Sequence, residues 1–562
     1  MNKHATYFKG WEVLALLAVL LFIHGAYSAQ QLIPVAIGVA LLLSGSIIYR
    51  LLTKSGLPPL NWLSIGCFFI AVSYGWTLWN TLSVEQSLLK ILEWLTYALL
   101  FMWVPVAYIH HARQWMLLFS SVFVFLHLAL LMGMIKVDGS LLFLDDHLSA
   151  SGMRLNGMLQ YANATAAIAG ALLLYHVHSY LQEQPWRYVN LLVMTGLAWI
   201  IWMTESRGAL LVVLLAVLAA LFMVEQHVRY LLLLLYISCS GFIGYVLFSF
   251  IPSMQIAALS VMILLFLCAF IIEKYNKKWD RSFPKVFIGG GVIVAGLGLL
   301  VLLQLPFIPS SIQQRLSVAT LADRFIYMKD AWQAIQDYWM LGAGGEAWQF
   351  AMHEYQSAPY IANDLHMFYE QHLLETGIFG FLLMLFLVGA ALWKVWQKNK
   401  ALLPPIIVLL AHGCIDFTLS YSISIILLLL FIYEGMGESI FIKSVRIPGV
   451  IGTSIMAVVV ALGATTWLQA ENAFAHYEQT RQPAFLAEAL DKNQFATRYY
   501  EALAQFADPV KTYETILKYE PHHARIHFYL GQLLEQEQPQ KAFDHYELAR
   551  KYDRFDFEGN GE

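Results

Sequence analysis

Long apolar segments dominate the chain up to about residue 470 and restrict it to one class of fold. A helix needs about 20 apolar residues to cross a bilayer. Hydrophobic residues make up 59% of the 562 and charged residues only 13%, against about 25% charged in soluble domains. The sequence therefore predicts an all-α polytopic membrane protein with about 12–15 transmembrane helices. The expected spans are residues 8–27, 31–52, 60–80, 87–109, 114–135, 159–181, 188–203, 208–225, 229–250, 254–272, 286–304, 376–396, 401–418, 421–441 and 447–468.

Positive charges between these spans predict their orientation. Lysines and arginines recur in alternate short loops, as at Arg113 beside His110 and His111, and most densely in EKYNKKWDRSFPK at 273–285. The positive-inside rule assigns this side to the cytoplasm, together with the N-terminus. The regions 136–158, 204–207 and 305–375, and the chain after 468, are then expected outside the cytoplasm.

The longest polar interruption lies within 305–375. Loops of this length are rarely simple connectors, and this one carries His353, His366 and, nearby, His372. Its glycines Gly342, Gly344 and Gly345 predict a tight turn or a close backbone approach. We expect N-terminal transmembrane helices over 1–304, a catalytic extracytoplasmic loop over 305–375, further transmembrane helices over 376–468 and a soluble helical domain over 469–562.

Four arginines are expected on the outer side, where the positive-inside rule disfavours them. They are Arg154, Arg207, Arg315 and Arg324. One interpretation is that their side chains reach toward lipid headgroups. The other is that they bind an anionic substrate, for which guanidinium is suited because it stays charged and forms bidentate hydrogen bonds.

The C-terminal part is charged and repetitive. YETILKYEP begins at Tyr513 and YELARKYDR at Tyr546, 33 residues later, close to the period of about 34 residues in tetratricopeptide (TPR) repeats. This pattern predicts a TPR-like domain that binds a protein partner or packs on the loop. A purely structural helical cap is the alternative.

Four segments in order resemble the O-antigen ligase and O-antigen polymerase superfamily of bacterial membrane proteins. They are RLNGMLQYANATAAIAG at Arg154, TESRGALLVVL at Thr204, DRFIYMKDAWQAIQDYWMLGAGGEAW at Asp323 and DLHMFYEQHLLETGIFG at Asp364. The resemblance covers roughly 150–400. It implies a bacterial cytoplasmic-membrane enzyme that transfers a glycan from undecaprenyl diphosphate to an acceptor hydroxyl, with inversion and without a metal. The acceptor would be a second lipid-linked glycan, a lipid core or a protein side chain.

The candidate residues suit that reaction. Arg154, Arg207, Arg315 and Arg324 would bind the diphosphate leaving group. His366 matches the histidine of the family pattern and is our candidate base, because an imidazole exchanges protons near neutral pH. His353 and His372 lack a motif match.

Other residues point to no cofactor. The cysteines Cys67, Cys239, Cys268 and Cys414 lie in apolar runs without a C-x-x-C pair, so we expect neither a metal site nor a disulfide framework. The sequence has no basic domain, so we do not expect it to bind nucleic acid. Glu93 and Asp416 fall in apolar runs, and His412 is a neighbour of Asp416 at helical spacing. We interpret them as a hydrogen-bonded structural pair, or as residues nearer the interface than the expected span bounds, rather than as a proton relay.

Three functions compete. The first is a surface-polysaccharide polymerase or ligase, with a protein O-oligosaccharyltransferase as the closest alternative because the repeats could recruit an acceptor protein. The second is a flippase of lipid-linked glycans, which would favour charges inside spans and inverted repeats. The third is a membrane scaffold that presents the repeats and for which the loop is dispensable.

Overall fold

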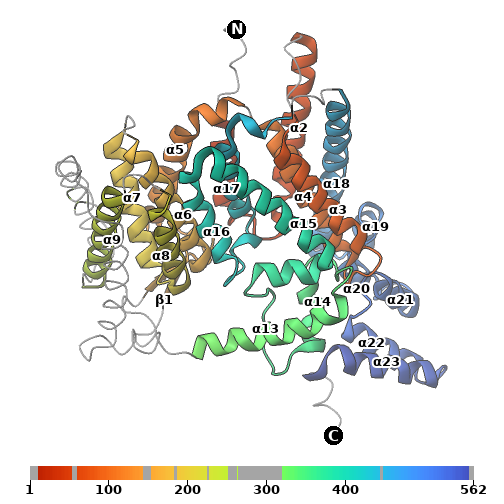
Figure 1. The fold of residues 1–562 in the computed structure, drawn as a ribbon. Coiled ribbons are helices and arrows are strands. Elements are labelled where there is room, and N and C mark those ends of the chain that lie inside the picture. Colours follow the sequence, from red (N-terminus) through yellow and green to blue (C-terminus); the bar gives the residue numbers. More distant parts are fainter. Residues whose placement is uncertain are drawn as a thin grey trace. The chain divides into compact units, whose positions relative to one another are not determined.

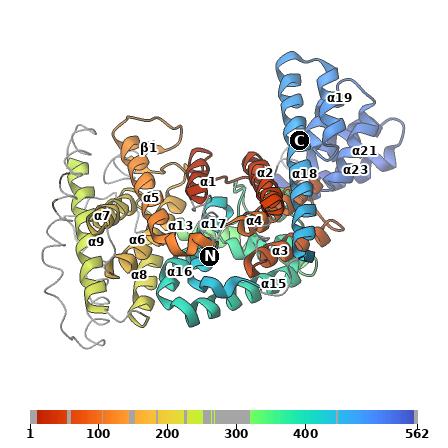
Figure 2. The same cartoon turned by 90° about the horizontal axis from the view of Figure 1, so that it is seen from above.

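The computed structural model describes residues 11–53, 60–104, 106–143, 153–182, 186–223, 227–250, 263, 267, 319–442 and 447–555. The fold is mostly helical, and Figures 1 and 2 show it in two views. The chain divides into two compact units, each built from three separate segments. The expected spans 254–272 and 286–304 and the candidate Arg315 lie outside the described residues, apart from Ile263 and Leu267.

The first unit comprises 1–27, 105–320 and 389–439. Its elements are α1 (Trp11–Phe22), α5 (Val106–Leu131), β1 (Leu141–Phe143), β2 (Met153–Leu155), α6 (Ala162–Leu181), α7 (Arg187–Met203), α8 (Arg207–Leu221), α9 (His227–Phe250), η1 (Lys400–Leu402), α16 (Leu403–His412), η2 (Thr418–Ser420) and α17 (Ser422–Met436).

Helix α6 forms the centre of this unit. Every residue in it except Asn163 is buried, and it packs against α7, α8, α9 and α16. Its first half is rich in alanine, and small side chains let neighbouring helices approach closely. This helix is therefore enclosed by protein, although its length and composition are those of a span.

The second unit comprises 28–104, 321–388 and 440–562. Here α2, α4 and α18 pack together, as do α3 and α4. Its elements are α2 (Ala29–Thr53), α3 (Trp62–Thr77), α4 (Val84–Trp103), α13 (Ala319–Tyr338), α14 (Ala347–Tyr355), the first part of α15 (Phe368–Asn399), α18 (Ile447–Thr480), α19 (Pro483–Lys492), α20 (Thr497–Leu503), α21 (Pro509–Tyr519), α22 (Ala524–Leu534) and α23 (Pro539–Tyr552). The short helix η3 (Gly437–Ile440) falls at the boundary of the units.

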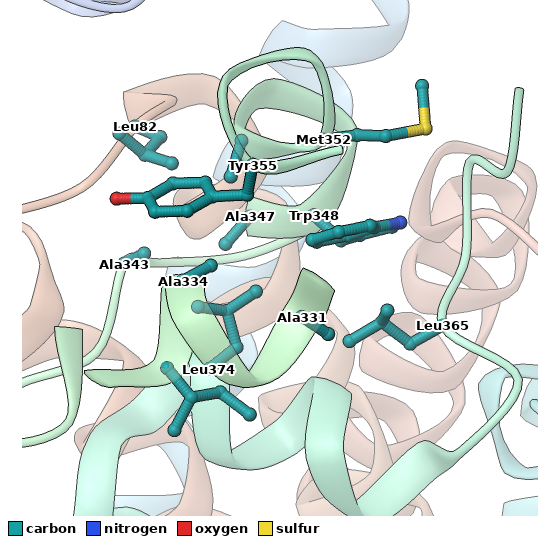
Figure 3. Close-up of a cluster of buried hydrophobic side chains, with 12 residues drawn as sticks. Leu82, Ala331, Ala334, Ala343, Ala347, Trp348, Met352, Tyr355, Leu365 and Leu374 are labelled. Carbon is teal, nitrogen blue, oxygen red and sulfur yellow. The ribbon is translucent and has the colours of Figure 1, made fainter. Parts of the chain in front are cut away.

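A compact apolar cluster joins the helices of the expected loop. Trp348 and Met352 of α14 meet Ala331 and Ala334 of α13, and Leu374 of α15 closes one side (Figure 3). Buried aromatic and aliphatic side chains contribute about 1.5–3 kcal/mol each. From residue 319 on, the polar stretch is consequently a folded layer with its own core.

Within the described residues, six helical segments are long and apolar enough to cross a membrane. Shorter apolar helices account for several other expected spans. The six segments are Gln30–Tyr49, Tyr108–Leu131, Ala162–Leu181, Phe368–His412, Ser422–Ile440 and Ile451–Thr480.

Several helix boundaries differ from the expected ones. Helix α4 ends at Trp103, and α5 begins directly after Pro105, because proline disfavours helix in the residue before it. His110, His111 and Arg113 thus lie in α5 and not in a loop. Helix α15 begins at Phe368, but its backbone is non-helical at Gly377 (φ +66°), so its second part begins close to the expected 376. Helix α18 continues past 468 to Thr480.

The all-α prediction missed one strand pair. Strands β1 and β2 are antiparallel, with Leu142 opposite Arg154, inside the region 136–158. Three-residue strands carry too little alternation of apolar and polar residues to be recognised in a sequence.

Candidate active site

Arg154 is held against the turn between α7 and α8 in the first unit. It lies on β2 between the buried Met153 and Leu155. Its Nε donates to the Thr204 carbonyl at 2.8 Å, and its Nη2 donates to Asn163 Oδ1 at 3.0 Å. The guanidinium therefore has a fixed direction.

Arg207 lies at the same turn. It is the first residue of α8 and is exposed. Ser206 caps this helix, accepting from the Ala209 amide at 3.4 Å. A helix N-terminus attracts anions through its free amides and dipole. The structure thus places Arg154 and Arg207 at one turn. This turn also carries Glu205, whose carboxylate accepts from the Tyr245 hydroxyl at 2.8 Å.

Asn163 links this turn to a buried acid. Its Oδ1 also accepts from Ser206 Oγ at 2.9 Å, and its Nδ2 donates to Asp416 Oδ2 at 2.7 Å. Tyr161 donates to both oxygens of Asp416 at 2.9 Å. Asp416 therefore fixes the orientation of the Asn163 amide, whose oxygen is turned toward Arg154.

Asp416 and His412 were expected in one helix of 401–418, but α16 ends at His412. Asp416 lies in the break before α17, and its hydrogen bonds run to Tyr161 and Asn163. His412 Nδ1 lies 2.7 Å from Thr418 Oγ1. Asn163 was not among our candidates, since one asparagine in an alanine-rich run gives no signal by itself.

His366 and Arg324 belong to the second unit. His366 is half-buried in the irregular segment before α15, and the preceding Leu365 points into the apolar cluster toward Trp348 (Figure 3). Burial and the nearby Arg324 guanidinium lower the pKa of His366 to about 4. The imidazole is therefore neutral at neutral pH and able to accept a proton.

An aromatic stack supports His366. The Tyr327 ring lies 6.0 Å from the imidazole and 4.4 Å from the Tyr360 ring. Tyr360 donates to Asp330 Oδ2 at 2.8 Å, and the Ser357 amide donates to the same oxygen at 2.8 Å. Asp330, which is fully buried, thereby holds the loop that backs the histidine.

The glycine turn of 342–345 passes close to two other segments. Gly342 and Gly344 have φ of +82° and +88°, and a Cβ on Gly344 would lie 2.0 Å from Thr81 Oγ1. The Ala343 amide donates to the Leu374 carbonyl at 2.8 Å. The predicted close backbone approach is confirmed.

A buried charge network, of which only Glu93 was singled out in the sequence, fixes this turn. Lys90 of α4 lies 2.8 Å from Glu346 and 3.2 Å from Glu93. Glu375 accepts from the Glu346 amide at 3.0 Å and from the Tyr74 hydroxyl at 2.6 Å. One lysine thus faces three carboxyl groups.

Lys90 could have been found in the sequence. A lysine inside an apolar run defaults to a functional hypothesis, and it stands three residues from Glu93, the residue that we singled out. Its partner Glu346 had no comparable signal, because it lies in a polar loop.

The two other loop histidines are less suited to catalysis. His372 is buried, with Nδ1 3.3 Å from the Tyr74 hydroxyl. His353 has a side chain 44% exposed and lies 3.9 Å from Asp553. The described residues contain no group of three or more His, Cys, Asp or Glu that could hold a metal ion.

The C-terminal helices are docked on the folded loop within the second unit. Glu354 of α14 lies 3.0 Å from His522 and 3.3 Å from Lys551. Burial raises the pKa of Glu354, but its contacts with His522 and Lys551 outweigh this and lower the pKa overall. Arg498 of α20 lies 3.0 Å from Glu85 of α4. Of the expected roles, packing on the loop is the one these contacts support.

Comparisons of the chain with protein-family models, with curated proteins and with solved structures find no match. The features that bear on function are therefore the four sequence segments and the geometry of the two arginine-bearing regions.

Proposed function

We propose that this chain is a multi-pass bacterial cytoplasmic-membrane glycosyltransferase that acts on undecaprenyl-diphosphate-linked glycan outside the cytoplasm. The observation that carries the proposal is His366, kept neutral by burial and by Arg324, in the segment that resembles the family pattern. The six long apolar helical segments of the described residues support a membrane location. We favour a polymerase or ligase of a surface polysaccharide.

The proposed reaction is a displacement at the anomeric carbon. The acceptor hydroxyl oxygen forms a bond to that carbon as its proton passes to His366 Nε2 or Nδ1. The bond from the anomeric carbon to the phosphate oxygen breaks, and undecaprenyl diphosphate leaves with the electron pair. A neutral imidazole can accept the proton directly.

The arginines would stabilise the leaving group. Arg154 and Arg207 stand at the N-terminus of α8, where helix dipole and guanidinium groups favour the same anion. Arg324, and Arg315 by sequence, are the other two candidates for binding the diphosphate oxygens.

A protein O-oligosaccharyltransferase is the second candidate. The C-terminal helices form pairs such as α22 with α23, as TPR repeats do, and expose Phe506, Leu533 and Phe543. Paired helices of this kind would be suited to recruiting an acceptor protein.

Lipid-linked intermediates in a deletion strain test the proposal. Accumulated single repeats on undecaprenyl diphosphate would identify a polymerase, and accumulated long polymer would identify a ligase. A normal glycan with an unmodified protein would identify an oligosaccharyltransferase. Unchanged intermediates, glycans and glycoproteins would contradict the transferase proposal.

Arg324→Gln should change the pH dependence of transfer. Removing the guanidinium removes its repulsion of the imidazolium, so the pKa of His366 rises from about 4 toward its ordinary value of about 6.5. Because the reaction needs neutral His366, the acid limb of kcat/KM should move to higher pH, in addition to any uniform loss of rate.

The control for this experiment is Lys329→Gln, which removes an exposed cation from the same helix. The acid limb of kcat/KM for Lys329→Gln should stay at the same pH as in the wild type. An Arg324→Gln profile that superimposes on wild type after scaling would show that Arg324 does not act on His366.

A further inference from the structure

Helix α13 carries a row of exposed aromatic side chains. Phe325, Trp332 and Trp339 are spaced by seven residues, which at about 100° per residue returns to nearly the same face of a helix. Their side chains are 67%, 51% and 52% exposed, and Trp339 directly follows the last residue of α13. Such an apolar row is unusual on a helix that faces water.

The face of α13 next to the aromatic row is fixed. Ala331, Ala334 and Ile335 are buried in the apolar cluster (Figure 3). Rotating the helix to bury the aromatic row would pull these residues out of their core. The aromatic row therefore points away from the second unit as a consequence of its packing.

The exposed side of α13 is divided lengthwise. Beside the aromatic row lies a polar edge, whose exposed members are Lys329, Gln333, Gln336 and Asp337. A helix with protein on one side, aromatic groups on the second and polar groups on the third fits a boundary between apolar and aqueous surroundings.

The aromatic row continues onto a candidate span. The Ile378 amide of α15 donates to the Trp339 carbonyl at 2.7 Å. From there α15 exposes Phe379, Leu382 and Phe386 at 56%, 53% and 69%. Both surfaces belong to the second unit, where α13 runs crosswise to the candidate span α2 (Figure 1).

We propose that α13 lies on the surface of a lipid bilayer, with Phe325, Trp332 and Trp339 in the boundary between headgroups and acyl chains. Tryptophan is enriched at this depth because its ring is apolar and its N–H is polar. The inference rests on the membrane location proposed above. It places the helix that carries Arg324 at the depth of a lipid-borne diphosphate.

Photocrosslinking in the full-length protein tests this orientation. A benzophenone amino acid replaces Trp332, Trp339, Gln333 or Phe386, one at a time, and the protein is placed in nanodiscs of palmitoyl-oleoyl phosphatidylethanolamine and phosphatidylglycerol. After irradiation, mass spectrometry measures phospholipid adducts. We expect adducts at 332, 339 and 386, with yields about tenfold above that at 333, which faces the polar edge.

The outcomes separate this inference from the proposed function. Adducts at 386 without adducts at 332 and 339, or crosslinks from 332 to another part of the protein, would overturn the surface orientation of α13 and leave the membrane protein intact. Absence of adducts at 386 would contradict the membrane location. The proposed glycosyltransferase and the orientation of α13 both depend on that location, so both would be contradicted.

Discussion

His366→Ala is expected to slow glycan transfer about 10²–10⁴-fold, the usual contribution of a positioned general base. The imidazole is half-buried and neutral because burial and Arg324 lower its pKa to about 4. Alanine has no group that can take the proton from the acceptor hydroxyl. Leu365, whose side chain is in the core, is unchanged, so the loop should stay folded.

The matched control is His353→Ala, a histidine of the same folded loop with an exposed side chain. Transfer from purified lipid-linked glycan, at equal membrane expression, is the measurement, and the control should keep its rate within a few-fold of wild type. Equal rates for His366→Ala and wild type would refute the role of His366 and favour a scaffold whose loop is dispensable.

Lys90→Met is expected to destabilise the protein strongly. Lys90 neutralises Glu346 and Glu93 in a buried network that also contains Glu375. Removing one partner of a buried ion pair costs about 3–5 kcal/mol, because the remaining charge is left without compensation. Thermal unfolding in nanodiscs should show a clear decrease in Tm.

Two further variants test whether the lost charge of Lys90 causes the decrease in Tm. Lys90→Met combined with Glu346→Gln removes both members of the closest pair and should recover part of the lost stability. Lys329→Met, which removes an exposed lysine, should leave Tm almost unchanged. If Lys90→Met unfolds at the wild-type temperature, the network does not hold the glycine turn.

Some features of the site follow from local sequence. Gly342 and Gly344 indicate a tight turn because a side chain is excluded from such conformations, and the structure has this turn. His366 is marked by its neighbours in DLHMFYEQHLLETGIFG. Arg207 is marked by its position at the start of an apolar run, where the structure begins α8.

Other features depend on which helices meet. Asn163 connects the nearby Arg154 to Asp416, which is 253 residues further along the chain. Lys90 connects α4 to Glu346, which is also far away in the chain. The strand pair that carries Arg154 was also missed. Arg315 and the two expected spans of 254–304 lie outside the described residues, so the predictions for them stand as predictions.

The sequence by itself determined the helical class, the apolar segments, the polar interruption and the residues suited to acid–base and anion chemistry. These depend on composition and on spacing between near neighbours. The tertiary structure decided that the interruption is a folded layer, that α6 is enclosed by protein, and that one lysine holds the glycine turn. Burial and charge pairing depend on distance in space, which residue order along a chain of this length does not specify.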